Sequence, residues 1–140
     1  MREFFSERQL RHQLIILTAL RDDVDPAALP YGAATAIANY LNKIGTLGRA
    51  GHVGLKNLYG ASQIYQAWWA TLAPTAQRMR TDTSLPTLFA DFEWLAGRFA
   101  ELDRRAGVTS QFDAAYVPAS LPRRIAITED LLRVEQELRH

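Results

Sequence analysis

The sequence predicts an all-α fold, a bundle of four to five helices in a single domain that spans residues 1–140. Apolar residues recur mainly at helical spacing, and runs that alternate apolar and polar residues are nearly absent. The length of 140 residues, with 48% hydrophobic and 22% charged residues, is typical of one globular domain. A domain of this size buries roughly 70% of the surface that its unfolded chain exposes, so its core needs neither a metal nor a disulfide.

Composition and charge exclude several classes of function. The chain contains no cysteine, which excludes disulfides, cysteine-ligated zinc, iron–sulfur clusters and thiol nucleophiles. Its formal net charge of +1 is too balanced for the electrostatic footprint of a dedicated nucleic-acid binder. The sequence therefore predicts no cofactor, no metal and no nucleic-acid partner. The absence of cysteine also fits a cytoplasmic location.

The longest apolar run, residues 14–20, predicts the core stripe of a first helix. This run is far shorter than the roughly 20 residues that span a bilayer. Glu3 and Glu7 precede it, and no cleavage site of small residues follows. We therefore expect neither a membrane partner nor a secretory signal. The first helix is expected to run from about Phe4 to Arg21 and to end at the acidic turn of residues 22–26.

Two further helices are expected before residue 81. The second, from about Pro30 to Ala50, carries an apolar stripe, and Gly45 and Gly48 within it are small enough for close helix contact. The third, from about Leu55 to Ala73, is apolar on more than one side and is expected to be central. Pro74 is expected to kink or restart this helix. Residues 81–84 are predicted to form a polar linker.

The fourth helix has the clearest pattern, because its apolar residues follow alternating steps of three and four, as in the seam of a helical bundle. These residues are Leu85, Leu88, Phe92, Leu95, Phe99 and Leu102. The helix is expected to end at Gly107. Residues 108–127 lose the pattern around two prolines and several aromatic residues, which predicts an irregular, packed connection. The last helix is expected to begin near Thr128, which acts as its cap.

Asp91 and Glu93 are the residues that most invite a catalytic interpretation. Two residues apart on a helix, they point in directions about 200° apart, so they cannot converge on one atom. We therefore predict no catalytic site. Glu93 is expected to pair with an arginine of a neighbouring helix, and Asp91 with Arg98 or solvent. No histidine stands at triad spacing from a carboxylate or hydroxyl, although triads also assemble between distant residues.

Aromatic residues that lie off the helical seams are candidates for an interface. Trp94 lies off the seam of its helix, on the same side as Asp91 and Arg98. Either residues 108–127 or the first helix cover it, or it is an exposed interface anchor, a role that Trp and Arg commonly have. The interaction candidates are Trp94, Arg98, Phe112 and Tyr116.

Three stretches between residues 39 and 96 occur in a distinctive combination. They are residues 39–51, a tryptophan-leucine-proline helix end at Trp69, Leu72 and Pro74 followed by Arg78, and residues 92–96. Together they resemble a family of uncharacterised bacterial helical proteins, over less than half of the chain. The family brings no established activity. Some members look membrane-anchored at the N-terminus, from which the short, charged first helix departs. The resemblance implies that Arg49, Arg78 and Glu93 form a recurrent polar arrangement.

The sequence predicts binding rather than catalysis. The favoured function is a non-enzymatic protein-interaction or self-association module, whose partner is another protein or a second copy in a homodimer. The alternative is a small-ligand-binding or sensor domain with a pocket between the second, third and fourth helices. Its pocket candidates are Tyr40, Arg49, Tyr65, Trp69, Arg78 and Glu93. An enzyme, the third class, needs a pocket in which Glu93, His52 or Asp91 meets a second functional group.

Overall fold

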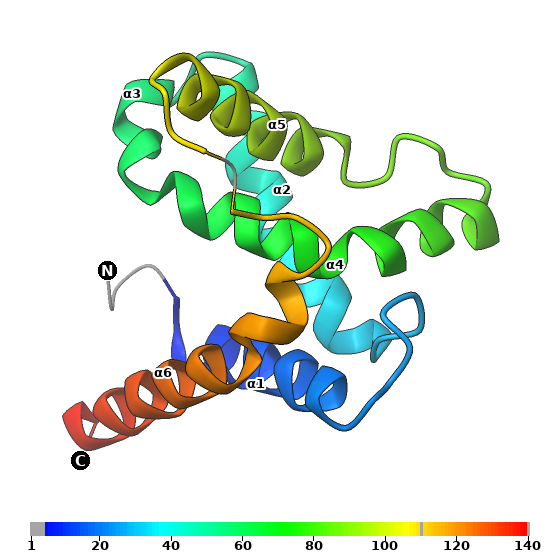
Figure 1. The fold of residues 1–140 in the computed structure, drawn as a ribbon, viewed down its shortest axis with the longest axis vertical. Coiled ribbons are helices and arrows are strands. Elements are labelled where there is room, and N and C mark those ends of the chain that lie inside the picture. The colour runs from blue at the N-terminus through cyan, green and yellow to red at the C-terminus, as the bar shows by residue number, and fades with distance from the viewer. Residues whose placement is uncertain (1–4, 110, 140) are drawn as a thin grey trace.

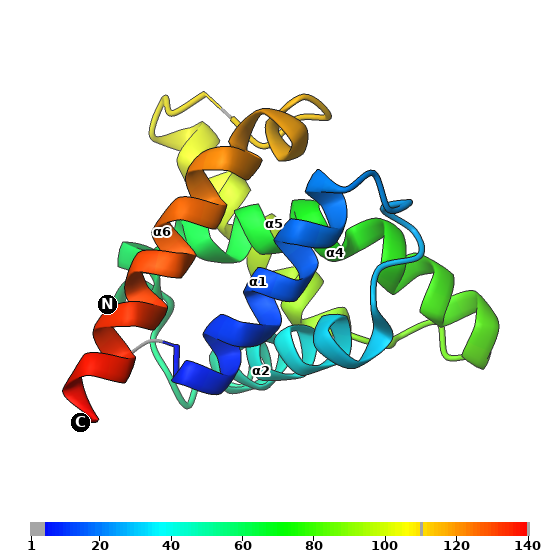
Figure 2. The same cartoon turned by 90° about the horizontal axis from the view of Figure 1, so that it is seen from below.

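The computed structural model describes residues 5–109 and 111–139. Its helices are α1 (Glu7–Arg21), α2 (Tyr31–Arg49), α3 (Leu55–Leu58), α4 (Ser62–Thr83), α5 (Ala90–Arg105) and α6 (Tyr116–Leu138), with a 3-10 turn, η1, at Tyr59–Ala61. No strand occurs among these residues, so the predicted all-α bundle is confirmed. α1 packs against α6, α2 packs against α5, and α4 runs between these two pairs (Figure 1). Figure 2 shows α1 crossing over α2 with α6 beside it.

The core lies where α1, α2, α4 and α5 meet. Tyr65 of α4 and Phe92 and Phe99 of α5 are fully buried there, beside aliphatic side chains of α1 and α2. Burying one such side chain stabilises the fold by roughly 1.5–3 kcal/mol. The predicted seam of α5 is confirmed at its centre, because Phe92, Leu95 and Phe99 expose no surface.

Gly45 allows α2 and α5 to approach closely. A Cβ atom built on Gly45 would lie 2.7 Å from the carbonyl carbon of Asp91, well inside van der Waals contact. The neighbouring Gly48 faces Leu58, whose Cδ1 would lie 3.3 Å from an added Cβ. The predicted close helix contact at these two glycines is therefore confirmed.

The region expected as one helix from Leu55 to Ala73 is divided, and its second part is longer than predicted. After α3 and η1, α4 begins at Ser62 and continues through Pro74 to Thr83. Proline removes one backbone donor, but Thr71, Leu72, Thr75 and Ala76 around it are buried, and this packing maintains the helix. The predicted restart at Pro74 is wrong, and so is the predicted linker at 81–84, because α4 ends only at Thr83 and is capped by Ser84, whose φ is 56°.

Two helix starts differ from the prediction. α1 begins at Glu7 because the Ser6 hydroxyl accepts a hydrogen bond from the Gln9 N–H at 3.2 Å; Phe4 lies outside the described residues. α5 begins at Ala90 rather than at Leu85, which is 53% exposed. Proline at 86 disfavours helical geometry in the residue before it. The predicted end at Gly107 is confirmed by its φ of 79°.

The largest correction concerns α6, which begins at Tyr116 and not near Thr128. Pro118 lies in the first turn, where backbone N–H groups lack helical partners. Pro122 is inside the helix, next to the buried side chains of Leu121 and Ile125. Thr128 is no cap, because its hydroxyl donates to the carbonyl of Arg124 at 2.8 Å inside the helix. The predicted irregular connection therefore ends before Tyr116. None of the helices given above has both the length and the hydropathy of a bilayer-crossing segment.

Candidate functional site

The aromatic residues predicted to line a ligand pocket, Tyr40, Tyr65 and Trp69, are instead part of the core or packed against it. The Tyr65 ring lies 5.5 Å from that of Phe99, and Trp69 meets Phe92 edge-on at 5.1 Å. Tyr40 is half-buried against the same core. None of these residues lines either of the two grooves described below.

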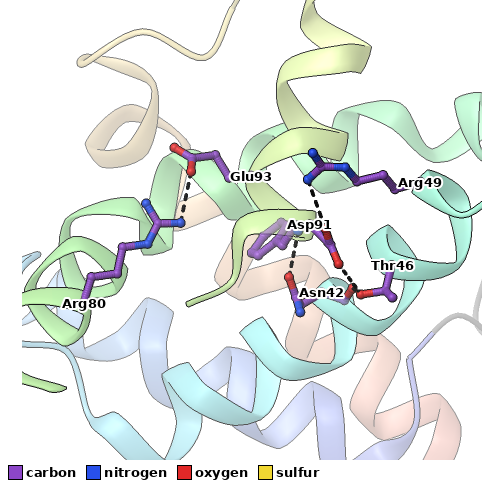
Figure 3. A network of polar contacts seen from close by, with 7 residues as sticks. Asn42, Thr46, Arg49, Arg80, Asp91 and Glu93 are labelled. Atoms are coloured by element: carbon purple, nitrogen blue, oxygen red, sulfur yellow. Dashed lines mark hydrogen bonds and ion pairs between the residues drawn. The ribbon is translucent and has the colours of Figure 1, made fainter. Parts of the chain in front are cut away.

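The predicted polar residues divide between two separate networks near the start of α5 (Figure 3). In the first, Asp91 accepts hydrogen bonds from the Thr46 hydroxyl at 2.6 Å and from Arg49 at 3.2 Å. Asn42 accepts the backbone N–H of Phe92 at 2.9 Å. This network joins α2 to α5. The predicted pairing of Asp91 with Arg98 is wrong, since Asp91 pairs with Arg49 of α2 and Arg98 pairs with Glu101.

In the second network, Glu93 accepts from Arg80 at 3.0 Å. The expected pairing of Glu93 with an arginine of a neighbouring helix is confirmed, but the arginine is not Arg78. Arg78 instead lies 3.7 Å from Asp82 on its own helix. The polar arrangement of Arg49, Arg78 and Glu93 implied by the family resemblance is therefore not formed. Both networks bind helix ends together, and neither brings two carboxylates to one point.

The four interaction candidates form two groups. Trp94 and Arg98 lie on α5, while Phe112 and Tyr116 pack edge-on at 4.8 Å at the start of α6, with α4 between the two groups (Figure 1). Trp94 is half-buried, and the guanidinium of Arg49 lies 5.6 Å from its ring. Trp94 was predicted to be covered by the first helix or by residues 108–127, but part of its cover comes from Arg49 of α2.

A groove of about 380 Å³ opens between α1, α4 and α6, and we call it the Arg124 groove. Aromatic side chains from α4 and from the start of α6 form much of its wall. Its lining consists of Gln13, Leu17, Gln63, Ile64, Ala67, Trp68, Gln111, Phe112, Tyr116, Ser120, Arg123, Arg124, Ile127, Thr128 and Leu131. The groove thus collects residues that are more than 100 positions apart in the sequence.

Arg124 is held between aromatic rings. Its guanidinium carbon lies 4.7 Å from the centre of the Trp68 ring and 5.6 Å from that of Tyr116. Its Nη1 donates to the Thr71 hydroxyl at 2.8 Å, whereas its Nη2 is fully buried and has no hydrogen-bond partner in the described structure. Burial lowers the pKa of Arg124, because desolvation disfavours the charged form. At neutral pH the group remains a cation.

Gln13 adds a neutral donor to the same groove from α1. Its side chain is only 4% exposed, and its Nε2 has no hydrogen-bond partner among the described residues. The hydroxyls of Ser120 and Thr128, which also line the groove, are engaged with backbone carbonyls of α6. Gln13 and Arg124 therefore supply the two buried donors of this groove that remain available.

A second groove, of about 600 Å³, lies on the other side of the first turns of α6. Phe112 lines both grooves. The second groove carries Asp23, Asp25 and Asp113, which are exposed, and the last two cap turns by accepting backbone N–H groups. No buried donor without a partner lines it in the described part of the chain. Its chemistry is explained by the turns that it contains.

Sequence reasoning found Phe112 and Tyr116 but missed Gln13, Trp68 and Arg124 as site residues. Tyr116, Ser120, Arg124 and Thr128 recur at every fourth position, which places them on one helical face. That signal is visible only if the helix continues through Pro118 and Pro122. Because proline disfavours a helix interior, the sequence alone places Arg124 in an irregular segment.

No three acidic, histidine or cysteine side chains of residues 5–109 and 111–139 gather closely enough to hold a metal ion. Protein-family models, curated proteins and solved structures provide no match to this chain, so the resemblance of residues 39–96 to a bacterial helical family stays a prediction.

Proposed function

We propose that the chain is a small-ligand-binding domain and that the Arg124 groove is its binding site. A small-ligand-binding domain was the alternative function that the sequence left open. The binding site proposed here lies between α1, α4 and α6 and not between the second, third and fourth predicted helices. The observation that carries the proposal is the pair of buried donors, Arg124 Nη2 and Gln13 Nε2, without a protein partner in one groove. A cytoplasmic location belongs to the same proposal and is supported by the absence of cysteine.

Hydrogen bonding gives the physical reason. Buried polar groups are nearly always paired, and an unpaired buried donor costs about 1–3 kcal/mol, and more when it is charged. An acceptor on a ligand removes that cost at the moment of binding. Ligand sites are also typically concave and mostly apolar, with a few convergent polar groups, and have volumes of roughly 300–1,000 Å³. The Arg124 groove has a volume in this range, a mostly apolar lining and two buried donors among its lining residues.

Access to the two donors requires a small movement. Both nitrogens lie below the surface of the groove, and the Tyr116 ring covers one face of the Arg124 guanidinium. Tyr116 in turn packs against Phe112, which belongs to the connection before α6. We therefore expect a ligand that reaches Arg124 to displace the Tyr116 ring from this face of the guanidinium.

The test is calorimetric titration with phenylbutyrate, its amide and its amine, three probes that share one apolar body. The variant Gln63→Trp places a large side chain at the edge of the groove. The control Gln77→Trp makes the same change at another exposed glutamine of α4 that lies outside the groove. We expect at least one probe to bind the wild type and Gln77→Trp equally, and Gln63→Trp about tenfold more weakly. Absence of binding by all three probes, or equal binding by both variants, contradicts the proposal.

The function favoured by the sequence, self-association, is supported by an apolar surface of α6 that begins at the Arg124 groove and shares Ile127 and Leu131 with its lining, which we call the α6 stripe. It consists of Ile127, Leu131, Val134 and Leu138, spaced in steps of four and three as in a coiled-coil seam. Three of its members are between 37% and 56% exposed. The C-terminal turns of α6 extend beyond the packed helices (Figure 1).

Charge favours a second copy of the chain, packed antiparallel, as the occupant of this stripe. Arg123 is exposed near its start, and Glu135 and Glu137 flank its end. An antiparallel copy places each basic start opposite an acidic end. Native mass spectrometry is expected to show a dimer that Val134→Glu abolishes and that Val108→Glu, at an exposed valine outside the stripe, leaves intact. A wild-type monomer at high protein concentration contradicts this second function.

A further inference from the structure

We infer that the ligand of the Arg124 groove is a monocarboxylate with an apolar or aromatic body. The inference rests on the proposed function and adds the chemical class of the ligand. It follows from three properties of the lining: the charges that face the groove, the donors that remain available and the side chains that form the walls.

The charge of the lining selects an anion. Arg123 and Arg124 line the groove, and none of its described lining residues is acidic. The neighbouring groove, which shares Phe112 with this one, has the opposite character, with three aspartates and no arginine. A ligand that carries negative charge is therefore attracted to the Arg124 groove and repelled from the other.

The donors select a carboxylate with a single charge. Arg124 is the one buried cation of the lining, and its planar guanidinium matches the plane of a carboxylate group. One carboxylate balances this one buried charge, while Arg123 is exposed and its charge is screened by solvent. Gln13 Nε2 is a neutral donor in the same groove. A phosphate brings a second charge for which the lining has no buried partner.

The walls select the rest of the ligand. Trp68 is 5% exposed and presents its ring to the groove together with Phe112 and Tyr116, and Ile64 and Leu131 add aliphatic surface. Removing apolar surface of this kind from water is favourable. A small polar anion such as acetate leaves these walls uncovered, so an aryl or alkyl chain is part of the inference.

The test uses the three probes of the proposed function, with phenylbutyl phosphate as a fourth. Wild-type protein is expected to bind phenylbutyrate about tenfold more tightly than its amide, because charge-assisted hydrogen bonds are roughly twice as strong as neutral ones. The amine is expected not to bind. If the amide binds as tightly as the carboxylate, the ligand class is wrong while the proposed function stands. If none of the four binds, the proposed function itself fails.

Two variants assign the preference to Arg124. Arg124→Gln is expected to abolish the preference for the carboxylate over the amide, and Arg124→Lys to retain part of it. Arg133→Gln, the control at an exposed arginine of α6 that does not line the groove, is expected to change it by less than about twofold. Should Arg124→Gln fail to fold, Gln13→Met removes the neutral donor at similar volume and is expected to weaken phenylbutyrate several-fold. A preference unchanged in every folded variant, or tighter binding of the phosphate than of phenylbutyrate, overturns the inference.

Discussion

Arg80 contributes more to the fold than the Glu93 with which it pairs. Its Nε donates to the carbonyl of Leu88 at 2.8 Å, its guanidinium lies over the Trp69 ring, and its side chain is 16% exposed against 46% for Glu93. Glu93→Gln is expected to cost less than about 1 kcal/mol of unfolding free energy, as exposed ion pairs do. Arg80→Met is expected to cost about 1–3 kcal/mol, because it leaves a carbonyl without its donor.

Urea denaturation of the two variants measures both values. Equal losses of stability, or a larger loss for Glu93→Gln, would show that Glu93 is the buried member of the pair. The sequence predicted the partner of Glu93 only as an arginine of a neighbouring helix, and the family resemblance implied Arg78 where the structure has Arg80. The two arginines point in directions about 200° apart on α4, and the rotation of that helix about its axis is set by its buried residues, which sequence spacing alone does not fix.

Tyr65 predicts how stability depends on pH at the alkaline end. Burial raises its pKa to about 12, because desolvation disfavours the phenolate. A tyrosine in the unfolded chain has a pKa of about 10. Between this pKa and that of the folded protein, the unfolded chain has lost a proton that the folded protein retains. The free energy of unfolding therefore falls as the pH rises from about 10 to about 12. Below this range the group contributes no pH dependence.

The variant Tyr65→Phe isolates this contribution. Urea midpoints measured for both proteins below and above about pH 10 are expected to show a smaller alkaline loss in the variant. The loss is not expected to vanish, because the pKa values of Tyr40 and Tyr59 are also raised, the first by burial and the second by its hydrogen bond to Asp103. An identical alkaline loss in both proteins would mean that Tyr65 is not buried as described.

At the scale of elements, the contact between α2 and α5 depends on Gly45. Gly45→Ala places a methyl group against the backbone of Asp91, so the two helices must separate. The overpacking is expected to cost about 1–3 kcal/mol. Gly97→Ala is the matched control, since nothing lies within 4 Å of its added Cβ. That change is expected to stabilise the protein by up to about 1 kcal/mol through helix propensity.

Thermal unfolding of the two glycine variants gives the measurement. If Gly45→Ala stabilised the protein, α2 and α5 would have to lie further apart at this contact than the structure shows. Small residues at this contact were visible in the sequence, because Gly45 and Gly48 lie on the apolar stripe of their helix. The contact of Gly45 with the start of α5 was not visible, because an apolar stripe does not show which helix packs against it.

Helix patterns were predictable where apolar spacing was regular, as in α2 and the centre of α5. Helix predictions from the sequence failed at the prolines inside α4 and α6. Pro74 and Pro122 lie inside α4 and α6, although propensity alone argues for a break at each. The buried neighbours of each proline supply the compensating packing. Since burial depends on which helices meet, this override of local propensity is a property of the tertiary structure.

At the scale of the whole molecule, the same error displaced the candidate site. The predicted pocket between the second, third and fourth helices corresponds to a region of close aromatic packing around Tyr65 and Phe99. The groove lies instead where α6 crosses α1 and α4, and α6 packs extensively against α1 but only sparsely against α4. Phe112 and Tyr116 were predictable as unusual aromatics. Arg124 and Gln13 were not, because their shared groove depends on an α6 that begins at Tyr116.

The central claim is that ligands bind in the Arg124 groove, and backbone amide chemical shifts in a titration with phenylbutyrate test it most directly. The largest shifts are expected in three separate segments that the groove brings together: the middle of α1 around Gln13, the start of α4 around Trp68, and residues 116–131 of α6. Shifts confined to residues around Tyr40, Tyr65 and Trp69, or spread along the second groove, would contradict the account.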